Sequence, residues 1–150
     1  MSSTFTAPIR IFVRNNPSND GTIAPDNTGA AECTVQATIT GATATTVTIP
    51  AGSIISNVRA YITTAAGSTS ATNVTVDSTV VGTLSDAAGI NTISLATGSS
   101  AVSKMANVGT ADVTVSYTAG ASAVGTLSVT YTPRNNNGTI TAYGSGLTNS

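Results

Sequence analysis

Side chains that commonly perform acid–base chemistry are sparse in this chain. It contains no histidine, and its acidic residues are scattered singly along the sequence. A glycosidase needs two carboxylates about 5–10 Å apart and usually aromatic rings that stack on the sugar, yet the chain has no tryptophan. Serine-nucleophile and phosphate-loop motifs are also missing. We therefore expect no enzyme activity and no cofactor. The acidic residues are Asp20, Asp26, Glu32, Asp77, Asp86 and Asp112.

Two further features bear on metal and thiol chemistry. Residues 16–21 (Asn-Pro-Ser-Asn-Asp-Gly) place oxygen ligands before a glycine, but a calcium loop also needs alternating acidic residues and a closing glutamate. An Asx-type turn is the favoured interpretation. The single Cys33 cannot form an intrachain disulfide and has no histidine to activate it. We expect Cys33 to be a small buried hydrophobe.

The charge of the chain argues against a nucleic-acid partner, and its hydropathy argues against a membrane partner. Lys and Arg total 5 against 6 Asp and Glu, and Arg10 with Arg14 is the nearest approach to a basic cluster. Nucleic-acid backbones are bound by larger groups of basic residues. No run approaches the roughly 18 apolar residues of a membrane span, and the first residues do not read as a secretion signal. We expect no nucleic-acid or membrane partner, and synthesis in a cytoplasm.

The composition is β-rich and unusually poor in charge. Only 7% of residues are charged, against about a quarter in an average domain. Threonine and valine, which are abundant here, are β-branched and fit a pleated sheet. A surface of Thr, Ser, Ala and Gly repels its neighbours weakly and so tolerates close packing against another protein. A secreted or halotolerant domain with a plain polar surface is the alternative interpretation.

Apolar and polar residues alternate repeatedly with a period of two. This pattern is typical of strands that bury one face, and turn signals separate the runs at the spacing seen in β-sandwiches. No helical stripe is sustained, so we expect very little helix. The pattern predicts an all-β fold: an antiparallel, jelly-roll-like β-sandwich, with a β-barrel as the alternative. The apolar phases are Ile9/Ile11/Val13, Cys33/Val35/Ala37/Ile39, Val58/Ala60/Ile62, Val74/Val76, Val113/Val115/Tyr117 and Leu127/Val129/Tyr131.

We expect one structural domain with three parts. Residues 1–31 comprise an N-terminal strand followed by an extended loop or arm rich in Pro, Asn, Asp and Gly. Residues 32–132 form the sandwich core. Residues 133–150 form a C-terminal hairpin or tail, in which Asn136-Asn137-Gly138 resembles a hairpin turn.

One strand offers a candidate interface. Tyr61 lies on the opposite phase from Val58, Ala60 and Ile62, and we expect it to share an outward face with Ile55 and Arg59. Tyrosine and arginine often anchor protein interfaces. We therefore expect Ile55, Arg59 and Tyr61 to form a subunit contact. Arg10 and Arg14 are the remaining interface candidates.

The segment 46–65, Thr-Val-Thr-Ile-Pro-Ala-Gly-Ser-Ile-Ile-Ser-Asn-Val-Arg-Ala-Tyr-Ile-Thr-Thr-Ala, is the most characteristic stretch. It resembles small β-sandwich virion proteins of tailed bacteriophages. The Gly-Thr-Leu-Ser-Val-Thr-Tyr at 125–131 resembles the last core strand of such proteins. The resemblance covers residues 45–131, and its motifs are short.

This resemblance implies a capsid decoration (cement) protein, a homo-oligomer and commonly a homotrimer, that binds the major capsid protein on the outside of the virion head and stabilises the shell. Several weak contacts made through one oligomer would add to a stable attachment. The alternatives are a head-fibre, tail or baseplate component, or a carbohydrate-binding, adhesin-like β-sandwich. The small number of aromatic residues weighs against the last of these.

Overall fold

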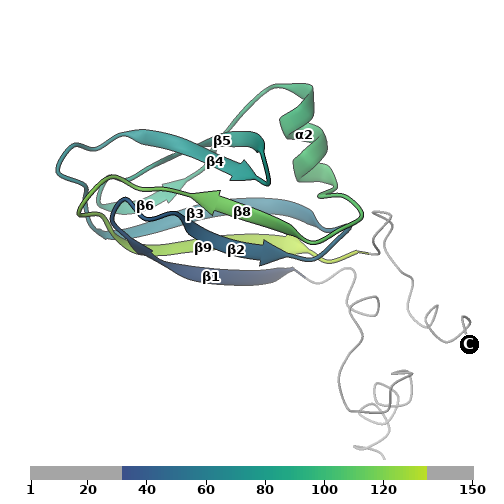
Figure 1. Cartoon of the computed structure of the whole chain (residues 1–150), viewed down its shortest axis with the longest axis horizontal. Helices are drawn as coiled ribbons and strands as arrows, with labels where there is room; N and C mark the ends of the chain where they lie inside the picture. Colours follow the sequence, from purple (N-terminus) through teal and green to yellow (C-terminus); the bar gives the residue numbers. More distant parts are fainter. Residues whose placement is uncertain (1–31, 135–150) are drawn as a thin grey trace, which may run out of the picture.

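The computed structural model describes residues 32–134, which form two antiparallel sheets packed face to face (Figure 1). The expected all-β antiparallel sandwich is confirmed. One sheet has the order β1-β9-β3-β6 and the other the order β2-β8-β4-β5-β7. The elements are β1 Cys33–Thr40, β2 Thr45–Ile49, β3 Ile54–Thr64, β4 Ala71–Val76, β5 Thr79–Ser85, β6 Gly89–Thr92, β7 Ser94–Leu95, α2 Ser99–Ala106, β8 Val113–Tyr117 and β9 Val124–Thr132.

The chain passes repeatedly from one sheet to the other. Strands β1, β2, β3 and β4 alternate between the two layers, and β9 returns to the first layer to lie between β1 and β3. Cys33 of β1 pairs with Tyr131 of β9, so the described chain enters and leaves at the same end of the sandwich. The connections therefore tie the two layers together at both ends.

Small and β-branched side chains fill the space between the sheets. The alternation expected from the sequence is confirmed in β3, β4, β8 and β9, whose inward residues are buried except for the half-buried Tyr131. In β1 only Ile39 is fully buried, while Cys33 is half-buried, contrary to the expectation of a buried thiol. Burial of such apolar surface is the main favourable term in folding. The largest fully buried side chains are Tyr117, Ile39, Ile49, Leu84, Leu127, Val58, Val74, Val76, Val81, Val108, Val115 and Val129.

The short helix α2 lies beside the edge of the five-stranded sheet (Figure 1). Ala101 is buried and Met105 packs on the core, so one helical face covers the sandwich, and Val108 just after the helix is buried as well. Nζ of Lys104 lies 3.0 Å from a carboxylate oxygen of Asp77 and donates to the Val108 carbonyl at 2.7 Å. Packing and the Lys104 contacts together fix the helix against the turn between β4 and β5.

A buried carboxylate organises the opposite end of the sandwich. Asp86, which is fully buried, accepts hydrogen bonds from the backbone N–H groups of Ser70 (2.6 Å) and Gly120 (3.0 Å), one on each oxygen. Its own N–H donates to the Ser70 carbonyl at 3.1 Å. A Cβ at Gly120 would lie 2.7 Å from the Asp86 carboxylate, so glycine permits this close approach. Asp86 thus joins the β3–β4, β5–β6 and β8–β9 loops.

Two substitutions of Asp86 test its two hydrogen bonds, one by removing a single acceptor and the other by removing both. Asp86→Asn retains one acceptor and should lower the free energy of unfolding by about 1–3 kcal/mol, because one buried N–H loses its partner. Asp86→Ala leaves both N–H groups without an acceptor and should lower the free energy of unfolding further. Urea denaturation measures both. Asp112→Ala is the control, because Asp112 accepts a single exposed bond from Ala51 N; equal losses for Asp86→Ala and Asp112→Ala would contradict the role of Asp86.

Tyr117 is the largest side chain that is fully buried in the core. Its hydroxyl makes no hydrogen bond to a described residue. Burial raises the pKa of Tyr117 above its usual value of 10.0, and the nearby Thr72 hydroxyl opposes this shift without reaching hydrogen-bond geometry. Burial also raises the pKa of Tyr131, which is half-buried beside Cys33. The folded state therefore favours the neutral phenols.

We expect the stability to fall as the pH rises above about 10. There the unfolded chain releases phenolic protons that the folded chain still holds, so each tyrosine lowers the free energy of unfolding by at most about 1.4 kcal/mol per pH unit. Tyr117→Phe should flatten this decline and be neutral or stabilising at pH 7, because an unpartnered buried hydroxyl is removed. Urea titrations from pH 7 to 12 measure how the free energy of unfolding depends on pH, and the substitution Thr48→Ala at an exposed position is the control. An unchanged alkaline slope in Tyr117→Phe would refute this account.

Candidate functional site

Strand β3 carries the three described residues that were expected to form an interface. It pairs with β9 along most of its length, but the register slips near its start: Ile55 pairs with Tyr131, and Asn57 pairs with Thr130. Ser56 between them has no partner, which makes it the extra residue of a β-bulge. A bulge shifts the alternation of side chains by one position.

This shift moves Ile55 into the core. Its side chain is only 3% exposed, so the expectation that Ile55 shares an outward face with Arg59 and Tyr61 is wrong. Arg59 and Tyr61 do lie on the outer face, because Val58, Ala60 and Ile62 alternate with them and are buried. A uniform two-residue period across residues 55–61 takes no account of this bulge, and for that reason the expected position of Ile55 was wrong.

Strand β6 adds an apolar neighbour to Tyr61. Ile90 pairs directly with Tyr61, and Thr92 pairs with Arg59. Residues that pair directly in an antiparallel ladder project to the same face. Ile90 is 69% exposed, the highest fraction among the exposed large hydrophobic residues of the described chain. The sequence pattern gave no signal for Ile90, because none of the alternating runs found in the sequence includes residues 77–112.

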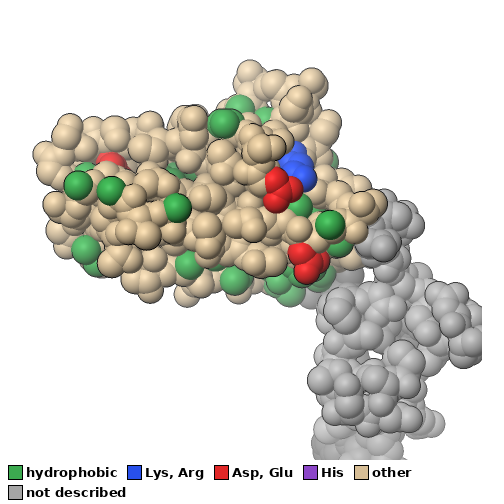
Figure 2. Space-filling view, viewed as in Figure 1, with side chains coloured by type: hydrophobic (Ala, Val, Ile, Leu, Met, Phe, Trp, Pro, Cys, Tyr) green, Lys and Arg blue, Asp and Glu red, His purple; other side chains and the backbone are tan. Residues whose placement is uncertain are grey.

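We call the outward surface of β1, β9, β3 and β6 the outer face. It is polar but largely uncharged apart from Arg59 and Glu32. On the opposite side of the molecule, which Figure 2 shows, most of the visible charged side chains lie near the end that carries α2. The outer face itself is a broad polar surface whose apolar contact points include Tyr61 and Ile90. Its other members include Thr34, Gln36, Thr38, Thr92, Val124, Thr126, Ser128 and Thr130.

A polar hollow of about 330 Å³ lies at one end of the outer face. It is lined by Glu32, Ser56, Asn57, Arg59 and Thr130. The Ser56 hydroxyl lies 2.8 Å from a Glu32 carboxylate oxygen and 3.2 Å from the Thr130 carbonyl oxygen, so the bulge residue holds Glu32 in place. Arg59 is exposed and makes no ion pair with another residue of the described chain. Its guanidinium is available for a carboxylate on a partner.

The described carboxylates are engaged in local contacts. Asp86 accepts the two backbone bonds given above, Asp112 accepts from Ala51 N at 2.9 Å, and Asp77 accepts from Thr114 N at 3.1 Å. The hydrogen bond from Lys104 is the main reason why the pKa of Asp77 lies below its usual value. Within residues 32–134 no three metal-ligating side chains gather. These acidic groups serve to hold loops and strand ends.

Several expectations fall on residues outside the described part of the chain. They are the interface candidates Arg10 and Arg14, the expected strand and loop within 1–31, and the turn at Asn136-Asn137-Gly138. In residues 32–134 no helix is long and apolar enough to cross a bilayer. Comparison of the chain with family models, with curated proteins and with solved structures found no match.

Proposed function

We propose that this chain is a capsid decoration (cement) protein of a tailed bacteriophage, which assembles through its outer face into a homo-oligomer, a trimer, and binds the major capsid protein on the virion exterior. The observation that carries the proposal is the grouping of Arg59, Tyr61 and Ile90 on a polar face that carries little other charge. The resemblance of residues 45–131 to phage virion proteins supplies the capsid as partner.

The chemistry of this group suits a subunit contact. Tyrosine and arginine are enriched among the residues that contribute most to binding, and they do so when surrounding contacts exclude water. Ile90 exposes apolar surface directly beside Tyr61, which a partner would remove from water. The neighbouring threonines and serine carry no charge that would have to be desolvated.

The strand order also supports a virion role. The first four strands of each sheet follow the orders β1-β9-β3-β6 and β2-β8-β4-β5. This order arises when one long two-stranded antiparallel ribbon folds over itself and supplies eight strands to two layers. Strand β7 and helix α2 are additions between β6 and β8. We infer a jelly roll on this ground, and jelly rolls are common in viral capsid proteins.

The outer face can be tested through the oligomer. Arg59→Ala and Tyr61→Ala should each weaken self-association about 30-fold, equivalent to a loss of about 2 kcal/mol at an interface anchor. Sedimentation equilibrium of the purified protein measures the constant. Thr48→Ala on the five-stranded sheet is exposed and serves as the control. A wild-type monomer at high micromolar concentration, or oligomers unaffected by either variant, would refute the proposed subunit contact.

Capsid binding can be tested separately. Purified protein added to capsids that lack their decoration protein should bind stoichiometrically and raise the temperature at which the shell opens, because bound ligand stabilises the state that it binds. The Arg59→Ala/Tyr61→Ala double variant should lose most of this gain, since a dissociated oligomer loses multivalent attachment. Calorimetry of the shells gives the readout. Absence of binding by the wild-type protein would exclude the capsid role, and rings or tubes in electron micrographs would favour a tail or baseplate component.

The polar hollow favours a second candidate function. A carboxylate, an amide and a guanidinium from Glu32, Asn57 and Arg59 line it together, and they offer donors and acceptors for sugar hydroxyls. Tyr61 lies two residues along the same strand face as Arg59. A glycan array probed with the oligomer would support a carbohydrate-binding module if Asn57→Ala abolished a reproducible signal, and a blank array would exclude it.

A further inference from the structure

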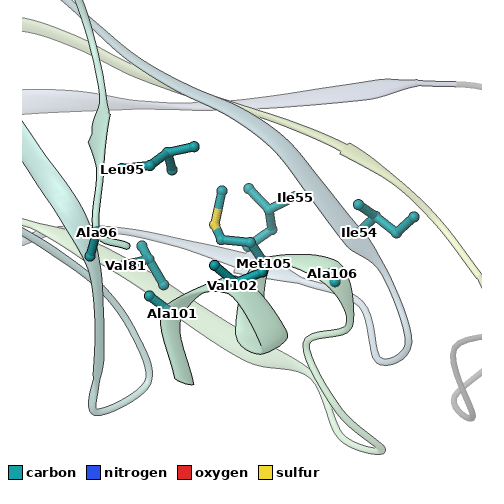
Figure 3. A pocket seen from close by; sticks show the side chains of 9 residues that line it. All are labelled: Ile54, Ile55, Val81, Leu95, Ala96, Ala101, Val102, Met105 and Ala106. Atoms are coloured by element: carbon teal, nitrogen blue, oxygen red, sulfur yellow. The ribbon is translucent and has the colours of Figure 1, made fainter. Parts of the chain in front are cut away.

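An apolar groove of about 240 Å³ opens between α2 and the two sheets (Figure 3). Its walls come from β3, β5, β7 and α2, and every side chain that lines it is apolar. Leu95 of β7 and Val102 of α2 are both 57% exposed. These side chains expose apolar surface that an occupant of the groove would cover. The groove residues used below are Ile54, Val81, Leu95, Val102 and Met105.

The groove exists because one sheet loses a strand. Strand β6 pairs only with residues from Arg59 to Ile62 of β3, and the N–H of Ile93 then donates to the Val58 carbonyl at 3.0 Å. The chain next leaves for the other sheet, where Leu95 pairs with Gly82 of β5. Within the described residues, no strand therefore lies beside β3 at 54–57 on that side. The groove has apolar walls and an open strand edge.

We propose that residues 9–14 of the same chain dock in this groove. Ile9, Ile11 and Val13 alternate with Arg10, Phe12 and Arg14, which gives the segment one face made only of branched apolar side chains. That face matches the apolar walls of the groove, and the two arginines lie on the opposite face of the segment together with Phe12. An extended segment placed along an open strand edge gains main-chain hydrogen bonds and fills pockets with alternate side chains.

The position of β1 makes the segment's own groove the nearest one. Cys33 pairs with Tyr131, and Tyr131 pairs with Ile55 at the groove, so the three residues form one row across the sheet. With strands about 4.8 Å apart, Cys33 lies roughly 10 Å from the strand that forms the wall. Residues 15–31 contribute seventeen residues of connection. A chain of that length can reach up to about 55 Å when fully extended, which exceeds the distance required.

This short connection also decides between the segment's own groove and that of a neighbouring copy. A tether of this length gives an effective concentration of about a millimolar, well above the micromolar concentration of a free subunit in a dilute sample. Docking within one chain is therefore favoured. The inference does not depend on the proposed capsid function, because a monomer that binds no capsid would still show it.

Disulfide trapping tests the occupant directly. In full-length Cys33→Ser protein, Ile9→Cys, Ile11→Cys or Val13→Cys is combined in turn with Val102→Cys and oxidised mildly at low micromolar concentration. At least one pair should form an intrachain disulfide, seen as a monomer that migrates faster in electrophoresis. The disulfide should form at roughly ten times the rate of the matched control pair, in which Val124→Cys replaces Val102→Cys. Val124 is 43% exposed and starts β9 at the opposite end of the sandwich.

Each alternative result overturns the proposal. Disulfides that form only between chains would assign the groove to a neighbouring copy, and rates equal to the Val124 control would show that the segment does not dock. A second measurement uses a dye that fluoresces on apolar surface. Ile11→Asp in the full chain should raise dye fluorescence severalfold by uncovering the groove, whereas Thr28→Asp in the connection adds the same charge and should not. Equal fluorescence of the two variants would also count against docking.

Discussion

The four-stranded sheet depends on the pairing of β9 with β1 on one side and β3 on the other. Both ladders run along nearly the whole of β9, so its backbone groups are satisfied in both directions. Leu127 and Val129 are fully buried from this central position. Gly125 allows the close approach, since a Cβ there would collide with the Tyr61 carbonyl. Because β9 is the last described strand, the sheet forms through contacts distant in sequence, which are slow to assemble.

Sequence periodicity was sufficient to predict the strands but not their irregularities. Val58, Ala60 and Ile62 alternate with polar residues, and this pattern alone located their buried face. The bulge at Ser56 depends on pairing with β9, so no local pattern predicted that Ile55 would turn inward. Helix α2 left only a weak signal, because it is eight residues long and just Ala101 and Met105 place apolar side chains on its core face. The groove beside α2 results from where β6 stops, which is a property of the assembled sheets.

Most charges in the described chain support the fold and leave its faces uncharged. Asp77 and Lys104 attach α2 to a turn, Asp112 holds Ala51, and Asp86 is buried among loops. Arg59 differs, because it is exposed on the outer face with no ion-pair partner among the described residues. A surface with so few free charges has little long-range repulsion, so the geometry of close contact decides what it binds. The outer face and the groove therefore offer two distinct kinds of contact, one broad and one narrow.

The pairing of Cys33 with Tyr131 has a mechanical consequence. The flanking segments leave from adjacent antiparallel strands at one end, so a pull applied through both segments would open the β1–β9 ladder one hydrogen-bonded pair at a time. The same ladder resists a force along the strands much better, because all of its bonds are then loaded together. A load carried across the sheets would be shared by the whole sandwich, whereas a load carried through the two flanking segments would peel β1 away first.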